Sequence, residues 1–407
     1  MNVIFLTISS DVQLSQRGIY TDLLRKFHKE GHRLWVVKIS PSEKTYPEEK
    51  EGLCIINVAT PLLTGQRNLI KKGYATLMIG KRFIKAIKQF VQEEFDLILY
   101  ATPPITFVNV IRYLEKRNPQ AKSYLLLKDI FPQNALDLGM LSTHGLKGVV
   151  YRLFRKQEKS LYRVSDYIGC MSPANVQYLL KHNPEVSKEI VEICPNSYDV
   201  YEETLSGYDV VLSVREKFHL PLDKPILIYG GNLGKPQGIP FLLECLKANK
   251  DREDCHFVLV GDGTEYHKIE DWVRREGPRN VSLYKRLPKI DYDSLVNACD
   301  IGLIFLDYHF TIPNYPSRLL SYLMAKKPIL ASTDPVSDVG TVAEANGYGL
   351  WCPSNNISAF TAQLNRILSC DLKQMGARGY QFYLDNYTVQ HTYDIIMRHF
   401  VQPINSI

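Results

Sequence analysis

Short apolar runs alternate along the chain with longer stretches in which apolar residues recur every three or four positions. The short runs, such as residues 97–101 and 301–305, show no strict polar alternation. This pattern is typical of parallel strands buried on both faces, with the longer stretches forming helices that cover the sheet. In the first part of the chain it predicts strands at 3–8, 33–39, 54–58, 97–101, 123–127, 167–171 and 191–194.

The alternation breaks between residues 196 and 224, where acidic residues are frequent, and then resumes. Further strands are predicted at 226–229, 257–260, 281–284, 301–305 and 328–331, and the region from 373 to 400 is rich in helix signals. We therefore expect two doubly wound α/β domains at 1–200 and 223–379, joined by a linker at 201–222. Two such domains leave a cleft, and ligands bind such sheets beyond the carboxyl ends of the strands.

Composition narrows the class of protein. The 407 residues are 45% hydrophobic and 23% charged, which excludes disordered and collagen-like chains. No apolar run reaches about 18 residues, so we expect no spanning helix. Residues 1–8 lack the basic start of a secretory signal. The eight cysteines form no C-x-x-C pair, which indicates reduced thiols in a cytoplasmic protein.

Two glycine-rich loops follow predicted strands. Gly230, Gly231, Gly234 and Gly238 follow the strand at 226–229, and the sequence Val260-Gly-Asp-Gly263 ends the next one. Such loops let the backbone approach an anion, and the N–H groups of the loop and helix then hold a phosphate. The spacing matches neither a dinucleotide fingerprint nor a P-loop. The alternative is two ordinary turns without a ligand.

A third segment, Pro316-Ser-Arg318, opens a predicted helix. A cation is disfavoured in the first turn of a helix, and an anion shared with Arg318 removes the conflict. The alternative is an arginine on a solvated surface.

Taken together, the three segments resemble the donor domain of family-4 glycosyltransferases. The motifs are Tyr229-Gly-Gly-Asn-Leu-Gly234 with Gln237-Gly, Val260-Gly-Asp-Gly263, and Pro316-Ser-Arg318 followed by Tyr322 and Ala325. Within the family, the bacterial N-acetylfucosaminyltransferase-like enzymes of capsule and O-antigen assembly are the most similar, and Lys128-Asp-Ile-Phe-Pro-Gln-Asn134 resembles a segment of their first domain.

The resemblance implies the GT-B fold, with a nucleotide-sugar donor on the second domain, the acceptor on the first, and a terminal helix at about 380–407 that returns to the first domain. It implies a retaining transfer in which cations and N–H groups stabilise charge growing on the leaving phosphate. The residues expected to bind the donor are Gly231, Asn232, Leu233, Gly234, Gln237, Gly261, Asp262, Gly263, Arg286, Leu287, Pro316, Ser317 and Ser321.

The sequence departs from the family pattern at charged positions. Asn232 and Gln237 stand where many members have Arg and Lys, and the two acids of the family's E-x7-E motif would fall near Pro313 and Ser321. Ser321 supplies at most a weaker hydrogen bond to the ribose. We expect Lys235 and Arg318 to provide the missing positive charge.

On the acceptor side, the resemblance points to the region after the strand at 123–127. Asp129 is the candidate base or sugar ligand, with Lys128 beside it, and the alternative is a turn residue before Pro132. Arg17 and Gly18 lie in a loop similar to the family's acceptor-side glycine loop.

Charge is unevenly distributed along the chain. Residues 1–200 carry a net charge of +9 and residues 201–407 of −3. No acid occurs from residue 52 to residue 92, where seven cations are interleaved with apolar residues, a pattern that suits an anionic membrane surface. These cations are Arg67, Lys71, Lys72, Lys81, Arg82, Lys85 and Lys88. A second basic run spans 147–163. In both runs the alternative is an ordinary solvated helix face, and no motif indicates nucleic-acid binding.

The leading hypothesis is a retaining, metal-independent glycosyltransferase without a cofactor. It would transfer a sugar from a nucleotide diphosphate sugar to an undecaprenyl-diphosphate-linked saccharide at the inner face of the plasma membrane. The donor expected first is a UDP-sugar. Asp291 and Asp293 form a D-x-D sequence that we interpret as a helix N-cap and first-turn acid rather than a metal site. The alternatives are a nucleotide-sugar epimerase and a non-catalytic sugar-binding or scaffold protein of the same fold.

Overall fold

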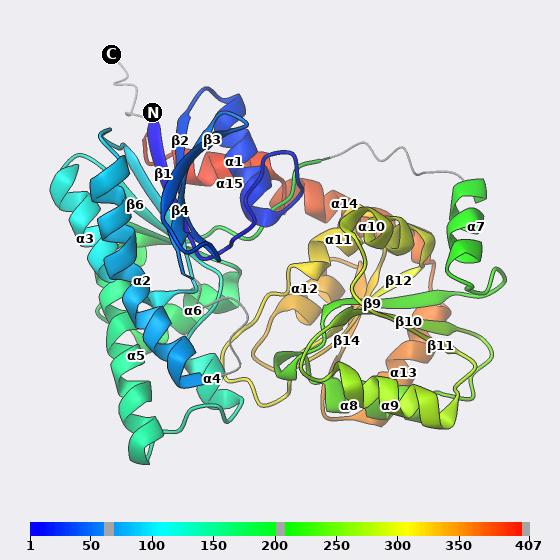
Figure 1. Cartoon of the computed structure of the whole chain (residues 1–407). Helices are drawn as coiled ribbons and strands as arrows, with labels where there is room; N and C mark the ends of the chain where they lie inside the picture. The colour runs from blue at the N-terminus through cyan, green and yellow to red at the C-terminus, as the bar shows by residue number, and fades with distance from the viewer. Residues whose placement is uncertain (61–68, 201–207, 401–407) are drawn as a thin grey trace. The chain divides into compact units, whose positions relative to one another are not determined.

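The computed structural model describes residues 1–60, 69–200 and 208–400, with side chains omitted at 69–77 and 208. The chain divides into two compact units (Figure 1). Unit 1 comprises Met1–Asp199 and Thr388–Ile407, and unit 2 comprises Val200–Tyr387. Each unit is built on one sheet with helices on both faces.

The sheet of unit 1 has eight strands in the order β3-β4-β2-β1-β5-β6-β7-β8. All neighbours are parallel except β3 and β4, which pair antiparallel. The strands are β1 (Asn2–Thr7), β2 (Arg33–Ser40), β3 (Tyr46–Lys50), β4 (Leu53–Ala59), β5 (Leu97–Ala101), β6 (Lys122–Leu127), β7 (Tyr167–Cys170) and β8 (Val191–Ile193). β3 was not predicted, because its five residues are all exposed and form an edge strand without an apolar pattern.

Helices cover both faces of this sheet. Buried residues of α2 (Leu69–Phe90), α3 (Val108–Arg117) and α5 (Gly145–Val164) share one apolar cluster on one face, which α6 (Pro173–His182) joins through Leu179. On the other face, α1 (Ile19–Lys29) and α15 (Val389–Met397) share a second cluster. The short helices are η1 (Ile105–Phe107), α4 (Gln133–Asp137) and η2 (Lys188–Ile190).

The end of the chain returns to unit 1, as α15. Tyr393 of α15 lies 2.8 Å, Oη to Nε2, from His32 beside α1, and His399 stacks on Tyr167 with centroids 3.6 Å apart. The expected terminal helix at about 380–407 is broken, since α14 (Leu372–Asn386) ends in unit 2 and Thr388 caps α15 by accepting from the amide of His391. Residues 401–407 lie outside the described part.

The sheet of unit 2 has six parallel strands in the order β11-β10-β9-β12-β13-β14. They are β9 (Ile226–Asn232), β10 (His256–Asp262), β11 (Val281–Tyr284), β12 (Ile301–Phe305), β13 (Ile329–Thr333) and β14 (Gly349–Pro353). Counted within the unit, this is the 3-2-1-4-5-6 order of dinucleotide-binding sheets. β14 was not predicted, because its short apolar run lies between Gly349 and Pro353, residues that are typical of turns.

One face of this sheet packs against α8 (Ile239–Ala248), α9 (Tyr266–Glu276) and α13 (Ile357–Leu368), around the buried Trp272. The remaining helices are η3 (Lys235–Gln237), α10 (Lys289–Ala298), α11 (Arg318–Met324), α12 (Val339–Ala345) and α14. Of the expected linker, residues 201–207 lie outside the described part. The rest holds α7 (Tyr208–Lys217), which packs on α10 within unit 2.

Candidate functional site

The sheet order of unit 2 reverses between β9 and β12, and the two strands separate there. β9 pairs with β10 as far as Asn232, but with β12 only as far as Ile228. Tyr322 of α11 satisfies the backbone that β12 leaves free, because its Oη donates to the Ile228 carbonyl and accepts from the Gly230 amide, both at 3.1 Å. Ligands of such sheets bind beyond the carboxyl ends of the strands at this reversal.

Arg318, the first residue of α11, lies where β9 and β12 separate. Its guanidinium carbon is 4.3 Å from the centroid of the Tyr229 ring, and its Nη2 donates to Gln237 Oε1 at 2.6 Å. A Cβ at Gly231 would lie 3.8 Å from the same Nη2. We call Tyr229, Gly231, Gln237, Arg318 and Tyr322 the Arg318 cluster. It joins the end of β9, the following glycine loop and α11.

The Arg318 cluster holds a positive charge without a counterion. Nη1 of Arg318 is buried without a hydrogen-bond partner among the described residues, and no described carboxylate pairs with the guanidinium. Burial raises the pKa of Tyr229, and raises that of Tyr322 to about 12, so both remain neutral phenols. A buried, unpaired N–H of a charged group is costly, and an anion is the ligand that would satisfy it.

The two glycine loops have a packing role as well as open backbone. A Cβ at Gly261 would lie 1.8 Å from the Gly231 carbonyl oxygen, and one at Gly230 would lie 2.1 Å from Tyr292 Oη. Leu233 is fully buried, and its amide and carbonyl are bonded to Asp262 and Glu265. Leu233 therefore belongs to the core. A ligand would meet Gly231 (φ 113°) and the exposed residues that follow it, Asn232 and Lys235.

Several other expected donor residues lie around the same edge of the sheet. Asn232, Lys235, Asp262 and Arg286 are exposed, and Lys235 forms no ion pair with a described residue. Gly234, Gly263 and Leu287 lie in the same loops, Pro316 and Ser317 directly precede α11, and Ser321 is buried within it. Because all six strands are parallel, the loops after β9, β10 and β11 lie at the edge that carries Arg318.

Sequence reasoning missed a buried carboxylate that follows β13. Asp334 accepts hydrogen bonds from the Val336 amide and from the amide and hydroxyl of Ser337. The Ser337 hydroxyl in turn accepts from the Asn314 amide at 2.8 Å. Desolvation raises the pKa of Asp334 to about 6 despite these bonds. The network fixes the loop that leads into α11 and Arg318.

In unit 1 the candidates Lys128 and Asp129 follow β6 at the carboxyl edge of the sheet. Thr102, which sequence reasoning did not single out, lies at the end of β5, and its Oγ1 accepts from the amides of both residues, at 3.0 and 3.2 Å. The Asp129 carboxyl is solvent-accessible, and partial desolvation raises its pKa. Thr102 therefore fixes the turn from which Asp129 projects.

Lys128, like Arg318, is a cationic residue with its charged group away from solvent and without a carboxylate partner among the described residues. Its Nζ donates to the Cys194 carbonyl at 3.2 Å. Burial lowers the pKa of Lys128 to about 8, although the nearby thiols of Cys194 and Cys170 act in the opposite direction. Burial also raises the pKa of Cys170 to about 12, so this thiol is neutral and offers Lys128 no counterion.

Gly18 and Arg17 end the loop between β1 and α1. Gly18 precedes the first turn of α1, and its amide donates to Asp22 Oδ1 at 3.2 Å. The buried Asp22 also accepts from Arg25 and from the Asp199 amide. This loop is therefore anchored by Asp22, and Arg17 is half-buried with contacts of its own.

The D-x-D sequence is engaged in ion pairs within unit 2. α10 begins at Lys289, so the expectation that Asp291 caps it was wrong and Asp291 lies in its first turn. Asp291 pairs with Lys217 at 2.7 Å, and Asp293 pairs with Lys289. Among the described residues, no three His, Cys, Asp or Glu side chains gather as metal ligands would.

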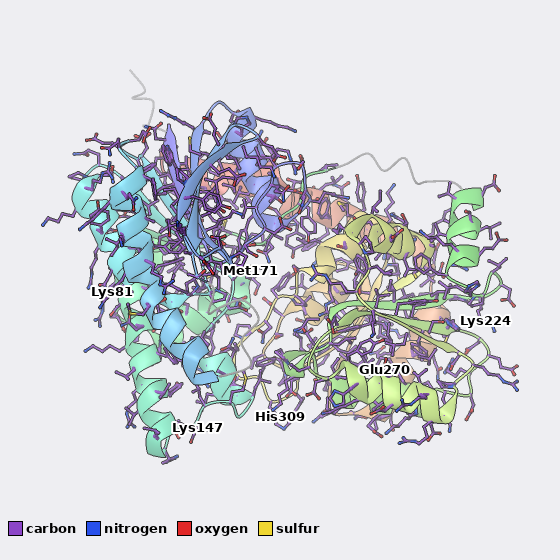
Figure 2. All side chains as sticks on the ribbon, in the orientation of Figure 1. Lys81, Lys147, Met171, Lys224, Glu270 and His309 are labelled. Carbon is purple, nitrogen blue, oxygen red and sulfur yellow. The ribbon has the colours of Figure 1, made fainter. Side chains whose placement is uncertain are left out.

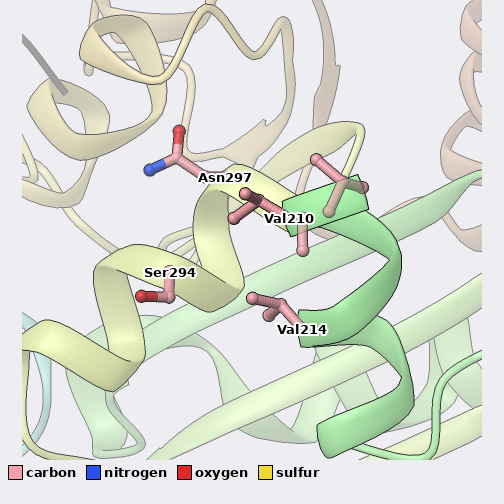
Figure 3. A pocket seen from close by; sticks show the side chains of 6 residues that line it. Val210, Val214, Ser294 and Asn297 are labelled. Carbon is pink, nitrogen blue, oxygen red and sulfur yellow. The ribbon is translucent and has the colours of Figure 1, made fainter. Parts of the chain in front are cut away.

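A small pocket lies between α7 and α10 (Figure 3). It is lined by Val210, Val211, Val214, Ser294, Asn297 and Ala298. The lining is mostly aliphatic and holds no charged group, so we assign it no ligand. Within the described ranges, no helix is long and apolar enough to cross a membrane.

The fold and the site together define the class of protein. The chain has the two-domain α/β GT-B fold, since it matches sucrose-phosphate synthase of Thermosynechococcus elongatus with a TM-score of 0.75 at 15% identity, over 98% of each chain. It also matches Anabaena HepE, solved in complex with UDP and glucose, with a TM-score of 0.68 at 13% identity, over 98% of this chain and 99% of that one.

Sequence comparison narrows the class. Residues 212–382 match the family described as Glycosyl transferases group 1, so unit 2 carries a domain of that family. The chain is 24% identical to the probable glycosyltransferase WbjE of Pseudomonas aeruginosa over 316 aligned residues. The alignment covers 77% of this chain and 76% of WbjE. The chain is also 24% identical over 405 residues to the putative colanic acid biosynthesis glycosyl transferase WcaI of Escherichia coli K12, which covers 93% and 95%.

Proposed function

We propose that the protein is a retaining glycosyltransferase that moves a sugar from a nucleotide diphosphate sugar to a lipid-linked saccharide during assembly of a bacterial surface polysaccharide. The observation that carries the proposal is the buried, unpaired Nη1 of Arg318 at the strand reversal of unit 2. A diphosphate offers oxygens to this nitrogen and to the glycine loop at once. Two comparisons support the proposal: residues 212–382 match the family Glycosyl transferases group 1, and the structurally similar HepE was solved with UDP and glucose bound.

In this proposal the diphosphate lies at the Arg318 cluster. Arg318 and Lys235 oppose the negative charge that develops on the leaving phosphate as the sugar–oxygen bond breaks. The N–H groups after Gly231 add to this stabilisation. The Tyr229 ring holds the guanidinium in place without neutralising it, because it remains a phenol. Tyr322, also a phenol, holds the β9 backbone beside it. Ser321 is buried, so we assign ribose binding to the loops rather than to its side chain.

The acceptor belongs to unit 1 in this proposal. Asp129 binds the acceptor sugar or takes the proton from its hydroxyl, since its raised pKa suits a base better than that of an ordinary aspartate. Lys128 provides a cation beside it. A UDP-sugar is the proposed donor and an undecaprenyl-diphosphate-linked saccharide the proposed acceptor, with neither metal nor cofactor required. The narrower N-acetylfucosaminyltransferase-like assignment, and a capsule or O-antigen product, are part of this proposal.

We further propose that the protein binds the inner face of the plasma membrane through cations of α2. Lys81, Arg82, Lys85 and Lys88 are exposed on the helix, while Phe83, Ala86 and Ile87 between them are buried. Figure 2 shows Lys81 at the surface of unit 1. Arg67 and the side chains of Lys71 and Lys72 lie outside the described part. Exposed cations attract anionic lipids even without inserted apolar groups.

The experiment that tests the proposed function is a nucleotide-release assay. Purified protein is mixed with a panel of nucleotide sugars, with or without a membrane extract that carries lipid-linked saccharides. A transferase releases free nucleotide only when both are present. Release without acceptor, or conversion of the donor to its epimer, would support the epimerase alternative, and no turnover with retained nucleotide binding would support the scaffold.

A further inference from the structure

Helix α5 exposes an apolar stripe that no described residue of unit 1 covers. Leu146, Val149 and Leu153 are 83%, 45% and 59% exposed. Their spacing of three and four residues places them on one face of the helix. Counting only helical side chains that the structure describes, which leaves out those of residues 69–77 and 208, α5 alone exposes more than one large apolar residue. Met140, on the loop before α5, is exposed as well.

The opposite face of α5 explains why the stripe points outward. Gly148, Leu161 and Tyr162 are buried, and Tyr162 donates to Glu158, which also pairs with Arg155 at 2.6 Å. Glu158 is the sole acid of the helix and is itself buried, so the outer face carries no negative charge. The helix is therefore fixed in rotation by its core contacts, with the stripe held in solvent.

Unpaired cations lie in the same turns of α5 as the stripe. Lys147, Arg152 and Lys156 are exposed and form no ion pair with any described residue, whereas Arg155 and Lys159 are paired with Glu158 and Glu185. Arg152 and Lys156 follow Val149 at helical spacing and therefore line one side of the stripe. Lys147 is at the surface in Figure 2.

We infer that the first half of α5 inserts its apolar stripe into the interface of an anionic lipid bilayer, with Lys147, Arg152 and Lys156 at the headgroups. Apolar side chains flanked by cations suit a surface that is negative outside and hydrocarbon within. An exposed apolar stripe in solvent is otherwise a liability. The inference deepens the membrane contact in the proposed function, and it adds to the α2 cations an element that inserts.

Flotation with lipid vesicles tests the inference on the full-length protein, without donor or acceptor. The vesicles contain phosphatidylcholine alone or mixed with phosphatidylglycerol. We expect binding to the mixed vesicles only. The Leu146→Ser/Val149→Ser/Leu153→Ser variant should bind about ten- to a hundredfold more weakly. Each of Lys147→Gln, Arg152→Gln and Lys156→Gln should weaken binding about fivefold.

A matched variant, Leu222→Ser/Ile290→Ser/Ile357→Ser, removes three exposed apolar side chains from unit 2. It should bind vesicles like the unchanged protein. Leu153→Trp provides a second readout, because the fluorescence of the introduced indole should be quenched by brominated lipid. Undiminished binding of the stripe variant, or the absence of quenching in Leu153→Trp, would overturn the inference. Self-association of the free protein that the stripe variant abolishes would overturn it as well, by assigning the stripe to a second copy of the chain.

Nucleotide binding, measured in parallel without lipid, separates this inference from the proposed function. A stripe variant that binds nucleotide but not vesicles supports both. A protein that binds vesicles through the stripe but binds no nucleotide leaves the inference standing and removes the proposed donor site.

Discussion

The guanidinium of Arg318 lies over the ring of Tyr229, 4.3 Å from its centroid, at the point where β9 and β12 separate. The ring face attracts the cation, and the phenol does not neutralise it. Gln237 satisfies Nη2, and Nη1 remains buried and unpaired. Unit 2 therefore maintains a positive charge that no described carboxylate neutralises.

Removing this charge should not harm the fold. We expect Arg318→Met to leave the thermal midpoint unchanged or to raise it, because it removes a buried N–H without a partner. Arg215 is the matched control, since it is also buried and bonds to the Ala298 carbonyl and Asp300, both at 2.8 Å. Arg215→Met should cost about 1–3 kcal/mol, because it removes the cation of the partly buried Asp300 and leaves the Ala298 carbonyl without its donor. Equal losses in the two variants, measured by thermal denaturation, would argue for a structural Arg318.

Lys235 should contribute less than Arg318, because it is exposed. Lys235→Ala is expected to weaken nucleoside diphosphate binding by about three- to tenfold, and less at high salt. Titration calorimetry at two salt concentrations measures this change. Lys373→Ala removes another exposed lysine of unit 2 and should change nothing; an equal effect of the two substitutions would show a general charge effect instead of a site.

Gly261 should be intolerant of any side chain. A Cβ there would lie 1.8 Å from the Gly231 carbonyl oxygen, so Gly261→Ala must push β9 and β10 apart. We expect a loss of several kcal/mol, about 3 or more, as for other overpacked sites. Gly277→Ala meets no atom within 4 Å and should cost about 1 kcal/mol for its positive φ. Urea denaturation of both variants compares them, and equal midpoints would contradict the packing account.

Lys128 should make the free energy of unfolding depend on pH in the alkaline range. Its pKa is about 8 in the folded protein and near 10.5 when unfolded, so between these values the unfolded chain binds more protons. The penalty for burying the ammonium is thus fully present below pH 8 and is relieved as pH rises towards 10.5. Lys128→Met should flatten this rise in the urea midpoint, whereas Lys122→Met, on the exposed start of β6, should retain it. A rise that persists in Lys128→Met would contradict the assignment.

Ser337 should matter to the site without touching the ligand. Ser337→Ala removes the bonds to Asp334 and from the Asn314 amide, at a cost of about 1–2 kcal/mol. Because these bonds fix the loop before Arg318, nucleotide affinity should fall severalfold in the same titration. Ser369→Ala, which removes an exposed hydroxyl bonded within its own helix turn, is the control. Unaltered affinity in Ser337→Ala would separate the network from the site.

The sequence predicts the parallel core of both units, because strands such as β5, β12 and β13 are apolar on both faces and leave an unambiguous pattern. It fails at β3, whose residues are all exposed. Arg318 was found from a local conflict between its charge and the start of its helix. The sequence identifies Tyr229 and Tyr322 only as members of family motifs. Their roles depend on the separation of β9 from β12, which no local pattern encodes. Thr102 was missed for the same reason, since it bonds to a loop distant in sequence. Asp334 bonds locally, and it reaches the segment before α11 only through the Ser337–Asn314 bond.

The diphosphate site at the Arg318 cluster is tested most directly by calorimetric titration of the protein with UDP, GDP and dTDP in the presence of EDTA, repeated with Arg318→Met. We expect one of the three nucleotides, UDP before the others, to bind with micromolar affinity, and we expect the folded variant to bind it about ten- to a hundredfold more weakly. Equal affinity of the two proteins, or no binding of any nucleotide to the unchanged protein, would contradict the assignment of the Arg318 cluster as a diphosphate site.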